Sequence, residues 1–338
     1  MFTKVTVIGT TSWGTTLAVL LALKGLGAWL WARTEEEARA LETGREQRAR
    51  LPGVPFPAGL RVTASMEEAL DGSSLAILAV PSQRLRENAR QVACHLDSRT
   101  IVMSATKGLE LDTCFRMSQV LAQELPESAA RCCVLSGPNI SREIAAGMPA
   151  ATVIASEDPA VADEARDLVR TPRFRVYSSR DVTGVELGGT LKNIIALGAG
   201  MNDGWGYGAN SKAAFMTRGL TEITRLGIAA GAEPLTFLGL AGLGDLVATC
   251  TSVHSRNRRA GEQLARGGTL QEVRRELGGV AEGLTTTTAA RELARRLGVE
   301  MPITEMTYRV LEEGLDPRTA IVELMAREPK FELEGLGK

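Results

Sequence analysis

Two lysines and an aspartate are the residues of this sequence best suited to chemistry. Lys107, in "SATKGLE", follows the carboxyl end of an apolar strand-like run, and open α/β sheets bind ligands at that edge. Lys192 lies inside the helical run "GVELGGTLKNIIALG", and Asp245 lies in "GLGDL". Each also has an ordinary structural explanation, since a helical lysine is usually solvated and "GLGDL" could be a turn in which the aspartate caps a helix. The neighbouring sequence motifs are therefore needed to choose between a functional and a structural role for these residues.

A phosphate site is predicted shortly after Asp245. In "SVHSRNRR", Ser255 is typical of a helix N-cap, so Arg256 and Asn257 would lie in the first helical turn. Free amides at a helix N-terminus, together with an arginine, bind phosphate well. The alternative is a basic, solvated helix face.

The segment "VIGTTSWGTTLA", residues 7–18, predicts a dinucleotide-binding turn. It joins the first apolar strand to an apolar helix, where a Rossmann turn has the pattern G-x-G-x-x-G. Gly9 and Gly14 occupy the first and third positions of that pattern, but Thr11 occupies the second, where glycine lets the pyrophosphate approach the backbone. A plain βα turn is therefore the alternative.

Arg33 is the residue expected to meet the cofactor ribose, because it ends the second strand-like run, 19 residues after Gly14. An NAD-specific site usually has Asp or Glu there, whereas arginine can pair with a 2′-phosphate. This favours NADP(H), or use of both cofactors, unless Arg33 is only a solvated surface residue. Two lysines, an aspartate, a phosphate site and a nicotinamide-type turn together suit the reduction of a phosphorylated carbonyl compound.

The elements that must position these residues fall into two groups. Up to about Asp181, apolar runs alternate with helical stretches, and "LAILAV" is apolar throughout, as expected of a strand covered on both faces. This predicts an α/β fold: a doubly wound Rossmann-type N-terminal dinucleotide-binding domain over residues 1–181, followed by an all-α substrate and catalytic domain over residues 182–338. The predicted strands are "KVTVIG", "AWLWA", "LAILAVP", "TIVMSAT", "CCVLSGP", "ATVIAS" and "FRVYS".

In the second half, residues typical of helix starts and helix ends replace the strand-like runs. They predict some seven to nine helices from residue 183 onward. Asp316 and Pro317 form an N-cap and first-turn pair, which typically starts a helix. Glycine is common just after a helix ends, so three glycines mark expected helix ends. These are Gly231, Gly298 and Gly314.

Composition argues against several classes of function. The 338 residues are 44% hydrophobic with a net charge of −1 and a pI near 6.3, which predicts a globular protein with no bulk charge for nucleic acid or an acidic membrane. The spacing of the five cysteines and two histidines suggests no metal site, and buried reduced thiols fit a cytoplasmic protein. A strand begins by Lys4, which leaves no room for a signal peptide, and no apolar run is long enough to span a bilayer.

The whole chain resembles bacterial NAD(P)-dependent glycerol-3-phosphate dehydrogenases, over about residues 4–325. The similar runs are "ATKGLE", "SGP", "FRVYSS", "GVELGGTLKN", "AGMNDG", "AGLGDLVATCTS", "SRNRR" and "EMPITE". The resemblance implies reversible hydride transfer between NAD(P)H and dihydroxyacetone phosphate, giving sn-glycerol 3-phosphate for phospholipid synthesis. It also implies a cytoplasmic homodimer.

The family pattern further implies roles for residues at matching positions. Lys192 would be the general acid of reduction and the base of oxidation, and Lys107 would contact both substrate and cofactor. Burial and a second cation would lower the pKa of a lysine that acts as a base. The other implied substrate contacts are Gly137, Asn139, Asp245, Ser255, Arg256 and Asn257. The cofactor contacts predicted from the turn and the family are Gly9, Ser12, Trp13, Gly14, Arg33, Lys107, Ser141, Arg256, Val280 and Glu282.

The first turn departs from the family's usual pattern, in which Ala, Gly and Ala stand where this chain has Thr10, Thr11 and Thr16. If the side chain of Thr11 cannot turn aside, we expect a loss of about 1–3 kcal/mol in cofactor affinity, although its hydroxyl could instead bond a phosphate oxygen. Thr11 is the only support for one alternative function, a non-catalytic homologue that binds a sugar phosphate. A related hydroxyacid dehydrogenase is the other alternative, but a non-phosphorylated substrate would not need "SRNRR".

Overall fold

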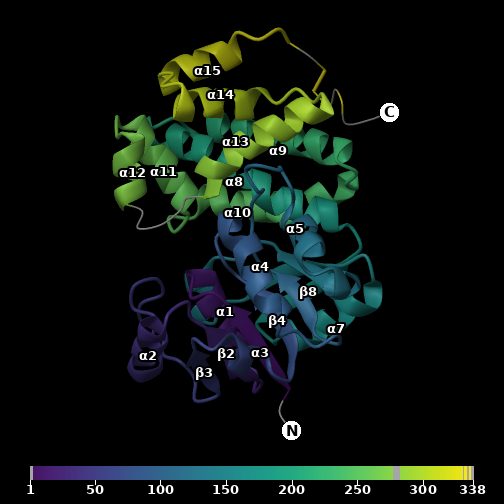
Figure 1. Ribbon diagram of the computed structural model, residues 1–338. Helices are drawn as coiled ribbons and strands as arrows, with labels where there is room; N and C mark the ends of the chain where they lie inside the picture. The colour runs from purple at the N-terminus through teal and green to yellow at the C-terminus, as the bar shows by residue number, and fades with distance from the viewer. Residues whose placement is uncertain (1–2, 277–281, 330, 333–334, 336–338) are drawn as a thin grey trace. The chain divides into compact units, whose positions relative to one another are not determined.

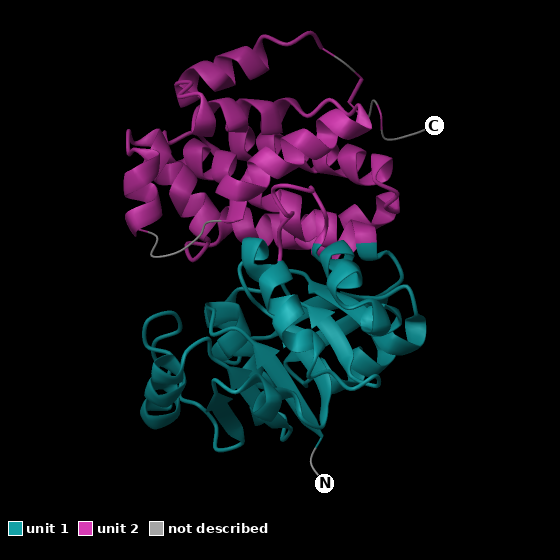
Figure 2. Cartoon of the chain, in the orientation of Figure 1, with its two compact units in different colours: residues 1–106, 117–182 teal, residues 107–116, 183–338 magenta. Residues whose placement is uncertain are grey.

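The computed structural model describes residues 3–276, 282–329, 331–332 and 335. The chain divides into two compact units (Figure 2). The first comprises residues 1–106 and 117–182, and the second comprises residues 107–116 and 183–338. The sequence-based division left the short segment 107–116 in the first domain, whereas its contacts place it in the second unit.

The first unit is built on one eight-stranded sheet with the strand order β3-β2-β1-β4-β5-β6-β7-β8. The strands are β1 Lys4–Ile8, β2 Gly27–Trp31, β3 Leu60–Thr63, β4 Ser73–Leu78, β5 Ile101–Ser104, β6 Cys132–Ser136, β7 Ala150–Ala155 and β8 Phe174–Ser179. All neighbouring strands pair in parallel except β6 and β7, which are antiparallel. The doubly wound α/β prediction is confirmed, but β3 was missed because it is a four-residue strand with an exposed arginine.

Helices connect these strands (Figure 1). The helices of the first unit are α1 Ser12–Leu23, α2 Glu35–Gly44, α3 Met66–Leu70, α4 Leu85–Ala93, α5 Met117–Glu124, α6 Ser141–Ala145 and α7 Pro159–Val169, with 3₁₀ turns η1 Ser82–Arg84 and η2 Pro126–Arg131. Strand β4 is fully buried from Leu75 to Leu78, which confirms that this apolar strand is covered on both faces.

The second unit is helical. Its elements are α8 Val182–Gly204, α9 Ala209–Ala229, η3 Pro234–Leu238, the π-helical segment η4 Leu240–Gly244, α10 Asp245–Thr251, α11 Arg256–Ala265, α12 Leu270–Glu276, α13 Glu282–Leu297, α14 Pro302–Glu312 and α15 Pro317–Met325. Within the described ranges, the eight α-helices from α8 to α15 agree with the predicted seven to nine helices. Asp316 caps α15 by accepting from two first-turn amides, and Gly231, Gly298 and Gly314 take positive φ after α9, α13 and α14.

Glycines allow the long helix α8 to touch its neighbours through the backbone. A Cβ on Gly200 of α8 would lie 1.8 Å from the carbonyl oxygen of Arg258, and one on Gly261 of α11 would lie 1.8 Å from that of Leu197. A Cβ on Gly188 would lie 2.7 Å from the carbonyl oxygen of Ala241. The segment η4 therefore contacts α8 through its backbone, one helical turn before Lys192.

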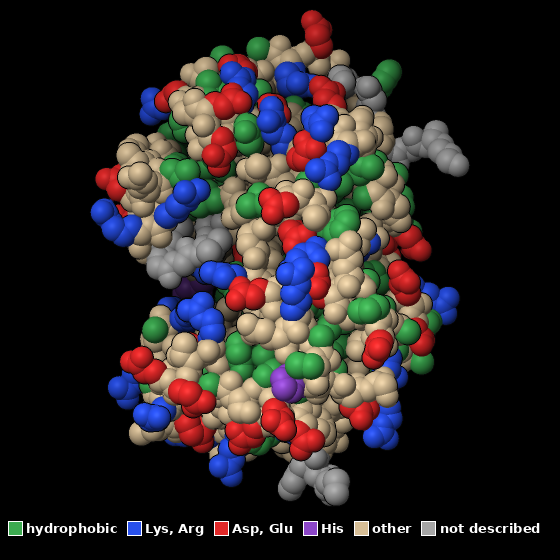
Figure 3. All heavy atoms as spheres, in the orientation of Figure 1, with side chains coloured by type: hydrophobic (Ala, Val, Ile, Leu, Met, Phe, Trp, Pro, Cys, Tyr) green, Lys and Arg blue, Asp and Glu red, His purple; other side chains and the backbone are tan. Residues whose placement is uncertain are grey.

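Basic and acidic side chains are interspersed over the face shown in Figure 3. Among the described residues, no helix combines the length and hydropathy that crossing a membrane would need.

Candidate active site

The two lysines singled out from the sequence meet at one carboxylate in the second unit. Lys192 Nζ donates to Asp245 Oδ1 at 2.8 Å, and Lys107 Nζ donates to Asp245 Oδ2. Lys192 also donates to the hydroxyl of Thr249, one helical turn after Asp245 on α10. The Asp245 side chain is only 2% exposed and the Lys192 side chain 8% exposed, so this ion-pair cluster is largely buried. Two ammonium groups share one carboxylate, which leaves a net positive charge.

Burial lowers the pKa of Lys107 to about 8. The Asp245 carboxylate opposes this shift, and the Lys192 ammonium adds to it. A buried cation beside a second cation is the arrangement expected to bring a lysine pKa toward neutrality.

Lys107 reaches the cluster because the segment 107–116 is tied to helix α8. The amide of Gly108 donates to Thr190 Oγ1 at 3.0 Å, in the helical turn before Lys192. At the other end of the segment, Arg116 forms an ion pair with the buried carboxylate of Glu186. Both anchors lie on α8, so one rigid helix fixes the spacing of the two amines.

The helix predicted to begin after Ser255 forms as expected. Ser255 is the N-cap of α11 and accepts from the amide of Arg258, which places Arg256 and Asn257 in the first turn. Arg256 is exposed, whereas Asn257 is buried. The Asn257 amide donates to Asn193 Oδ1 at 2.9 Å and accepts from the amide of Gly283 at 3.0 Å. Its side chain therefore joins α8, α11 and α13.

Two residues of this cluster were missed from the sequence. Thr249 lies four residues after Asp245, a spacing that puts both on one helix face, and this signal could have found it. Asn193 directly follows Lys192, but it lies on a helix that is buried nearly all round, so no local pattern indicates its hydrogen bond to α11.

The candidate cofactor turn lies in the first unit, between β1 and α1. Gly9 has φ +112°, and a Cβ there would lie 2.8 Å from the carbonyl oxygen of Ala79, so only glycine fits. Gly14 is equally enclosed, since its Cβ would lie 2.1 Å from the Gly9 carbonyl oxygen. The first-turn amides of Ser12 and Trp13 make no hydrogen bond within the described residues. These features fit a pyrophosphate.

Other predicted cofactor contacts are placed as follows. Arg33 is exposed two residues after β2 ends, with no ion pair in the described part of the chain. The Trp13 ring is partly buried and packs edge-on against Phe174, at 6.4 Å between ring centroids, so this side chain packs against the core of the first unit. Ser141 begins α6. Glu282 begins α13, whereas Val280 lies outside the described residues.

Gly137 and Asn139 follow strand β6 in the first unit. Gly137 has φ +149°, and a Cβ there would meet Thr152 of β7 at 3.0 Å. The Asn139 amide nitrogen donates to Thr152 Oγ1 at 3.0 Å, while its buried Oδ1 has no partner in the described structure. A buried acceptor without a donor is costly, which makes Asn139 Oδ1 a candidate acceptor for a ligand hydroxyl.

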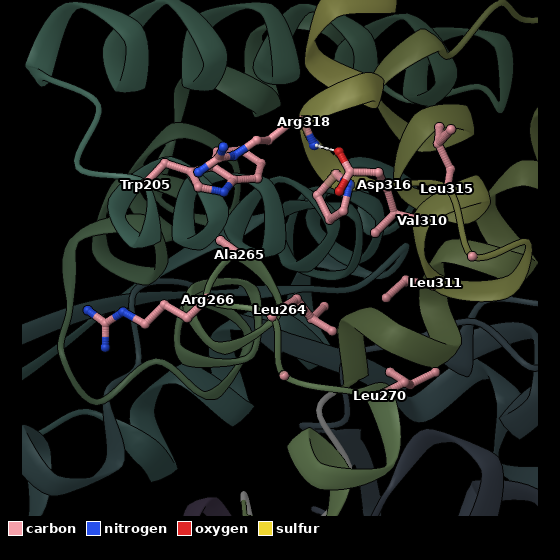
Figure 4. Close-up of a pocket in the computed structure, with 14 residues that line it drawn as sticks. Trp205, Leu264, Ala265, Arg266, Leu270, Val310, Leu311, Leu315, Asp316 and Arg318 are labelled. Atoms are coloured by element: carbon pink, nitrogen blue, oxygen red, sulfur yellow. Dashed lines mark hydrogen bonds between the residues drawn. The ribbon is translucent and has the colours of Figure 1, made fainter.

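Two pockets of the second unit are separate from the lysine–aspartate cluster. One has a volume of about 710 Å³ and is lined by residues that include Trp205, Leu270 and Asp316 (Figure 4). The other, of about 860 Å³, is lined mainly by α8, α9, α14 and α15. Neither pocket includes Lys107, Lys192 or Asp245 in its lining. Among the described residues, no group of acidic, cysteine and histidine side chains could hold a metal ion.

A Rossmann-type unit with a glycine turn and free amides, followed by a helical unit with paired buried amines, defines an NAD(P)-dependent oxidoreductase. Comparison with known proteins specifies the family. Residues 4–162 match the N-terminal domain and residues 181–322 the C-terminal domain of NAD-dependent glycerol-3-phosphate dehydrogenase. The chain belongs to this family.

Individual relatives agree with this assignment. The chain is 51% identical to glycerol-3-phosphate dehydrogenase [NAD(P)+] of Dehalococcoides mccartyi, over 98% of this chain and 93% of that protein. It is 50% identical to the enzyme of the same name from Geobacter sulfurreducens, over 98% of this chain and 99% of that protein. The crystal structure of glycerol-3-phosphate dehydrogenase from Coxiella burnetii superposes with a TM-score of 0.92 at 37% identity, covering 96% of this chain and 99% of that chain.

Proposed function

We propose that this protein catalyses the reversible NAD(P)-dependent interconversion of dihydroxyacetone phosphate and sn-glycerol 3-phosphate. The observation that carries the proposal is the buried cluster in which Asp245 binds the amines of both Lys107 and Lys192. When bound, the reduced nicotinamide supplies the hydride that reaches the ketone carbon. The chain's own residues supply the proton and the charge that the reaction needs.

Lys192 is the proposed proton donor in reduction. When hydride reaches the carbonyl carbon, negative charge develops on the carbonyl oxygen, and a nearby ammonium stabilises that charge and then protonates the oxygen. Asp245 and Thr249 hold the Lys192 ammonium in place through the bonds described above. Lys107 supplies a second positive charge, and in oxidation Lys192 takes the proton back.

The substrate phosphate is proposed to bind at the N-terminus of α11. Ser255, Arg256 and Asn257 lie there, and a helix N-terminus with an arginine suits a dianion. The first-unit residues Gly137 and Asn139 complete the proposed substrate contacts.

The proposed cofactor contacts are the residues predicted from the turn and the family, with Arg33 favouring NADPH through its guanidinium. Arg33→Ala should then weaken NADPH binding more than NADH binding, and equal effects would remove the argument for this preference. The proposal includes a cytoplasmic homodimer that supplies glycerol phosphate for phospholipid synthesis.

A spectrophotometric assay tests the reaction directly. Purified protein is incubated with dihydroxyacetone phosphate and either NADH or NADPH, and oxidation of the reduced nicotinamide is followed by its absorbance. Dihydroxyacetone, which lacks the phosphate, is the matched control and should react far more slowly. Absence of turnover with both cofactors would overturn the proposal, and equal rates with both ketones would overturn the phosphate site. Sedimentation analysis tests the homodimer.

A further inference from the structure

The hydroxyl of Thr11 is turned toward the sheet. Thr11 Oγ1 donates to the carbonyl oxygen of Ala79, just after β4, at 2.7 Å, and accepts from the amide of Gly14 at 3.0 Å. The side chain is thus the N-cap of α1. Its φ of −64° and ψ of 164° are open to any residue, so the backbone at this position does not require glycine. Since Thr11 already uses its proton, it offers no hydrogen bond to a phosphate oxygen.

Two neighbouring threonines make similar connections. Thr10 Oγ1 donates to Glu37 Oε1 in the first turn of α2 at 2.6 Å. Thr16 Oγ1 donates to the carbonyl oxygen of Ser12 at 2.8 Å and lies 3.4 Å from that of Ser141 in α6. The hydroxyls at these three positions therefore connect the turn to α2, to the end of β4 and to α6.

We infer that Thr10, Thr11 and Thr16 form a threonine brace that holds the turn in its cofactor-binding shape before the cofactor arrives. The inference rests on the cofactor site of the proposed function. A braced turn has already lost the conformational freedom that binding would otherwise have to remove. The brace leaves the amides of Ser12 and Trp13 available for the pyrophosphate, while it uses the amide of Gly14.

Thr11 is consequently a positioning residue, and its effect on binding opposes the steric effect expected from the sequence. Glycine at position 11 would remove both hydrogen bonds and would also add backbone freedom. Glycine is itself a tolerable N-cap, but loss of a hydrogen bond such as the one to the Ala79 carbonyl oxygen typically shifts a local equilibrium by roughly two- to tenfold. Thr11→Gly should therefore weaken NADPH binding by roughly that factor.

The test uses three variants at position 11 in the full chain. Thr11→Ser keeps the hydroxyl with less bulk, Thr11→Val keeps the bulk without the hydroxyl, and Thr11→Gly removes both. Calorimetry gives the Kd for NADPH, and hydrogen exchange of the cofactor-free protein reports on the amide of Thr15, which donates to the Thr11 carbonyl oxygen at 2.9 Å. We expect Thr11→Ser to behave like the original protein, and Thr11→Val and Thr11→Gly to bind more weakly and exchange faster.

Thr100→Val is the matched control. Thr100 is buried in the same unit and donates one hydroxyl bond to the Ser73 carbonyl oxygen at 2.8 Å, but it lies outside the turn. It should lower thermal stability without a comparable effect on the Kd or on exchange at the turn.

Tighter NADPH binding by Thr11→Gly, or unchanged exchange in Thr11→Val, would overturn the brace while leaving the proposed function intact. Failure of the original protein to bind either reduced cofactor would instead overturn the proposed function and the purpose assigned to the brace. The exchange measurement needs no cofactor, so the two failures are distinguishable.

Discussion

At the scale of single residues, the proposed chemistry depends on the one carboxylate that holds two amines. Asp245 neutralises only half of the charge of Lys107 and Lys192, so a positive charge remains to meet developing negative charge. We expect Lys192→Ala to lower kcat by roughly 10²–10⁴-fold, the usual contribution of a general acid. Binding of NADPH, measured by calorimetry, should change little.

Lys192→Arg separates charge from proton transfer. Arginine keeps the positive charge but does not release its proton near neutral pH. The variant should therefore remain as inactive as Lys192→Ala in steady-state assays. Near-normal turnover would contradict the assignment of Lys192 as the proton donor.

Lys107 should titrate near pH 8, well below an ordinary lysine, because it is buried beside a second ammonium. A lysine whose pKa is lowered by folding binds fewer protons in the folded than in the unfolded chain between about pH 8 and the ordinary value near 10.4. Stability contributed by this group therefore rises as pH increases through that window.

Lysine side-chain NMR checks this prediction, with Lys107→Arg used to assign the signal. A titration midpoint near 10.4, the ordinary lysine value, would show that the pKa of Lys107 is not lowered.

At the scale of elements, α8 and α11 carry the proposed catalytic amine and the proposed phosphate site, and the two helices are in backbone contact. Gly261→Ala would put a methyl group 1.8 Å from the Leu197 carbonyl oxygen, so the helices must separate. We expect a loss of about 1–3 kcal/mol in stability and a higher KM for dihydroxyacetone phosphate. Thermal unfolding and steady-state kinetics measure the two effects.

Gly44→Ala, at the end of α2, is the control, because nothing lies within 4 Å of its added methyl. Equal behaviour of the two variants would show that the contact does not set the spacing of α8 and α11.

Glu222 connects α9 to the start of α14. Its carboxylate accepts from the amides of Ile303 and Thr304 and from the Thr304 hydroxyl, at 2.7–2.8 Å. Burial raises the pKa of Glu222 to about 7, against the effect of these donors. A carboxyl whose pKa is raised by folding binds more protons in the folded chain, so its contribution to stability falls as pH rises from about 4.3 to about 7.

Glu222→Gln replaces one carboxylate oxygen, an acceptor, with an NH₂ donor that faces an amide. We expect the free energy of unfolding to fall by about 1–3 kcal/mol. Urea unfolding at several pH values measures this loss. The decline in stability across the acidic window should be smaller in the variant, and an unchanged pH dependence would show that Glu222 does not titrate there.

Much of the element pattern could be read from the sequence because burial and capping leave local signals. The apolar run of β4 and the Asp316–Pro317 start of α15 are such signals, and both are confirmed. The segment 107–116 gave none, since its place in the second unit depends on distant contacts with Thr190 and Glu186. The same holds for the candidate site. Residue types suggested Lys107, Lys192 and Asp245, but only the fold brings the two amines to the Asp245 carboxylate.

At the scale of the whole molecule, cofactor binding should be visible as stability. A ligand that binds only the folded state at a hundred times its Kd adds about 2.7 kcal/mol, which for a chain of this size raises the Tm by several degrees. We expect NADPH to produce such a shift in the original protein and in Lys192→Ala, as measured by differential scanning calorimetry. Gly9→Ala, whose methyl would lie 2.8 Å from the Ala79 carbonyl oxygen, should lose most of the shift.

The polypeptide passes between its two units three times, at 106/107, 116/117 and 182/183. A fragment cut at the last of these points would carry Lys192 and Asp245 but not Lys107, so one of the two amines would be left behind. Gene fusion or recombination at that junction would thus separate the two lysines of the proposed site. The second unit can be exchanged between relatives with both lysines from one parent only if the ten residues 107–116 are transferred together with residues 183–338.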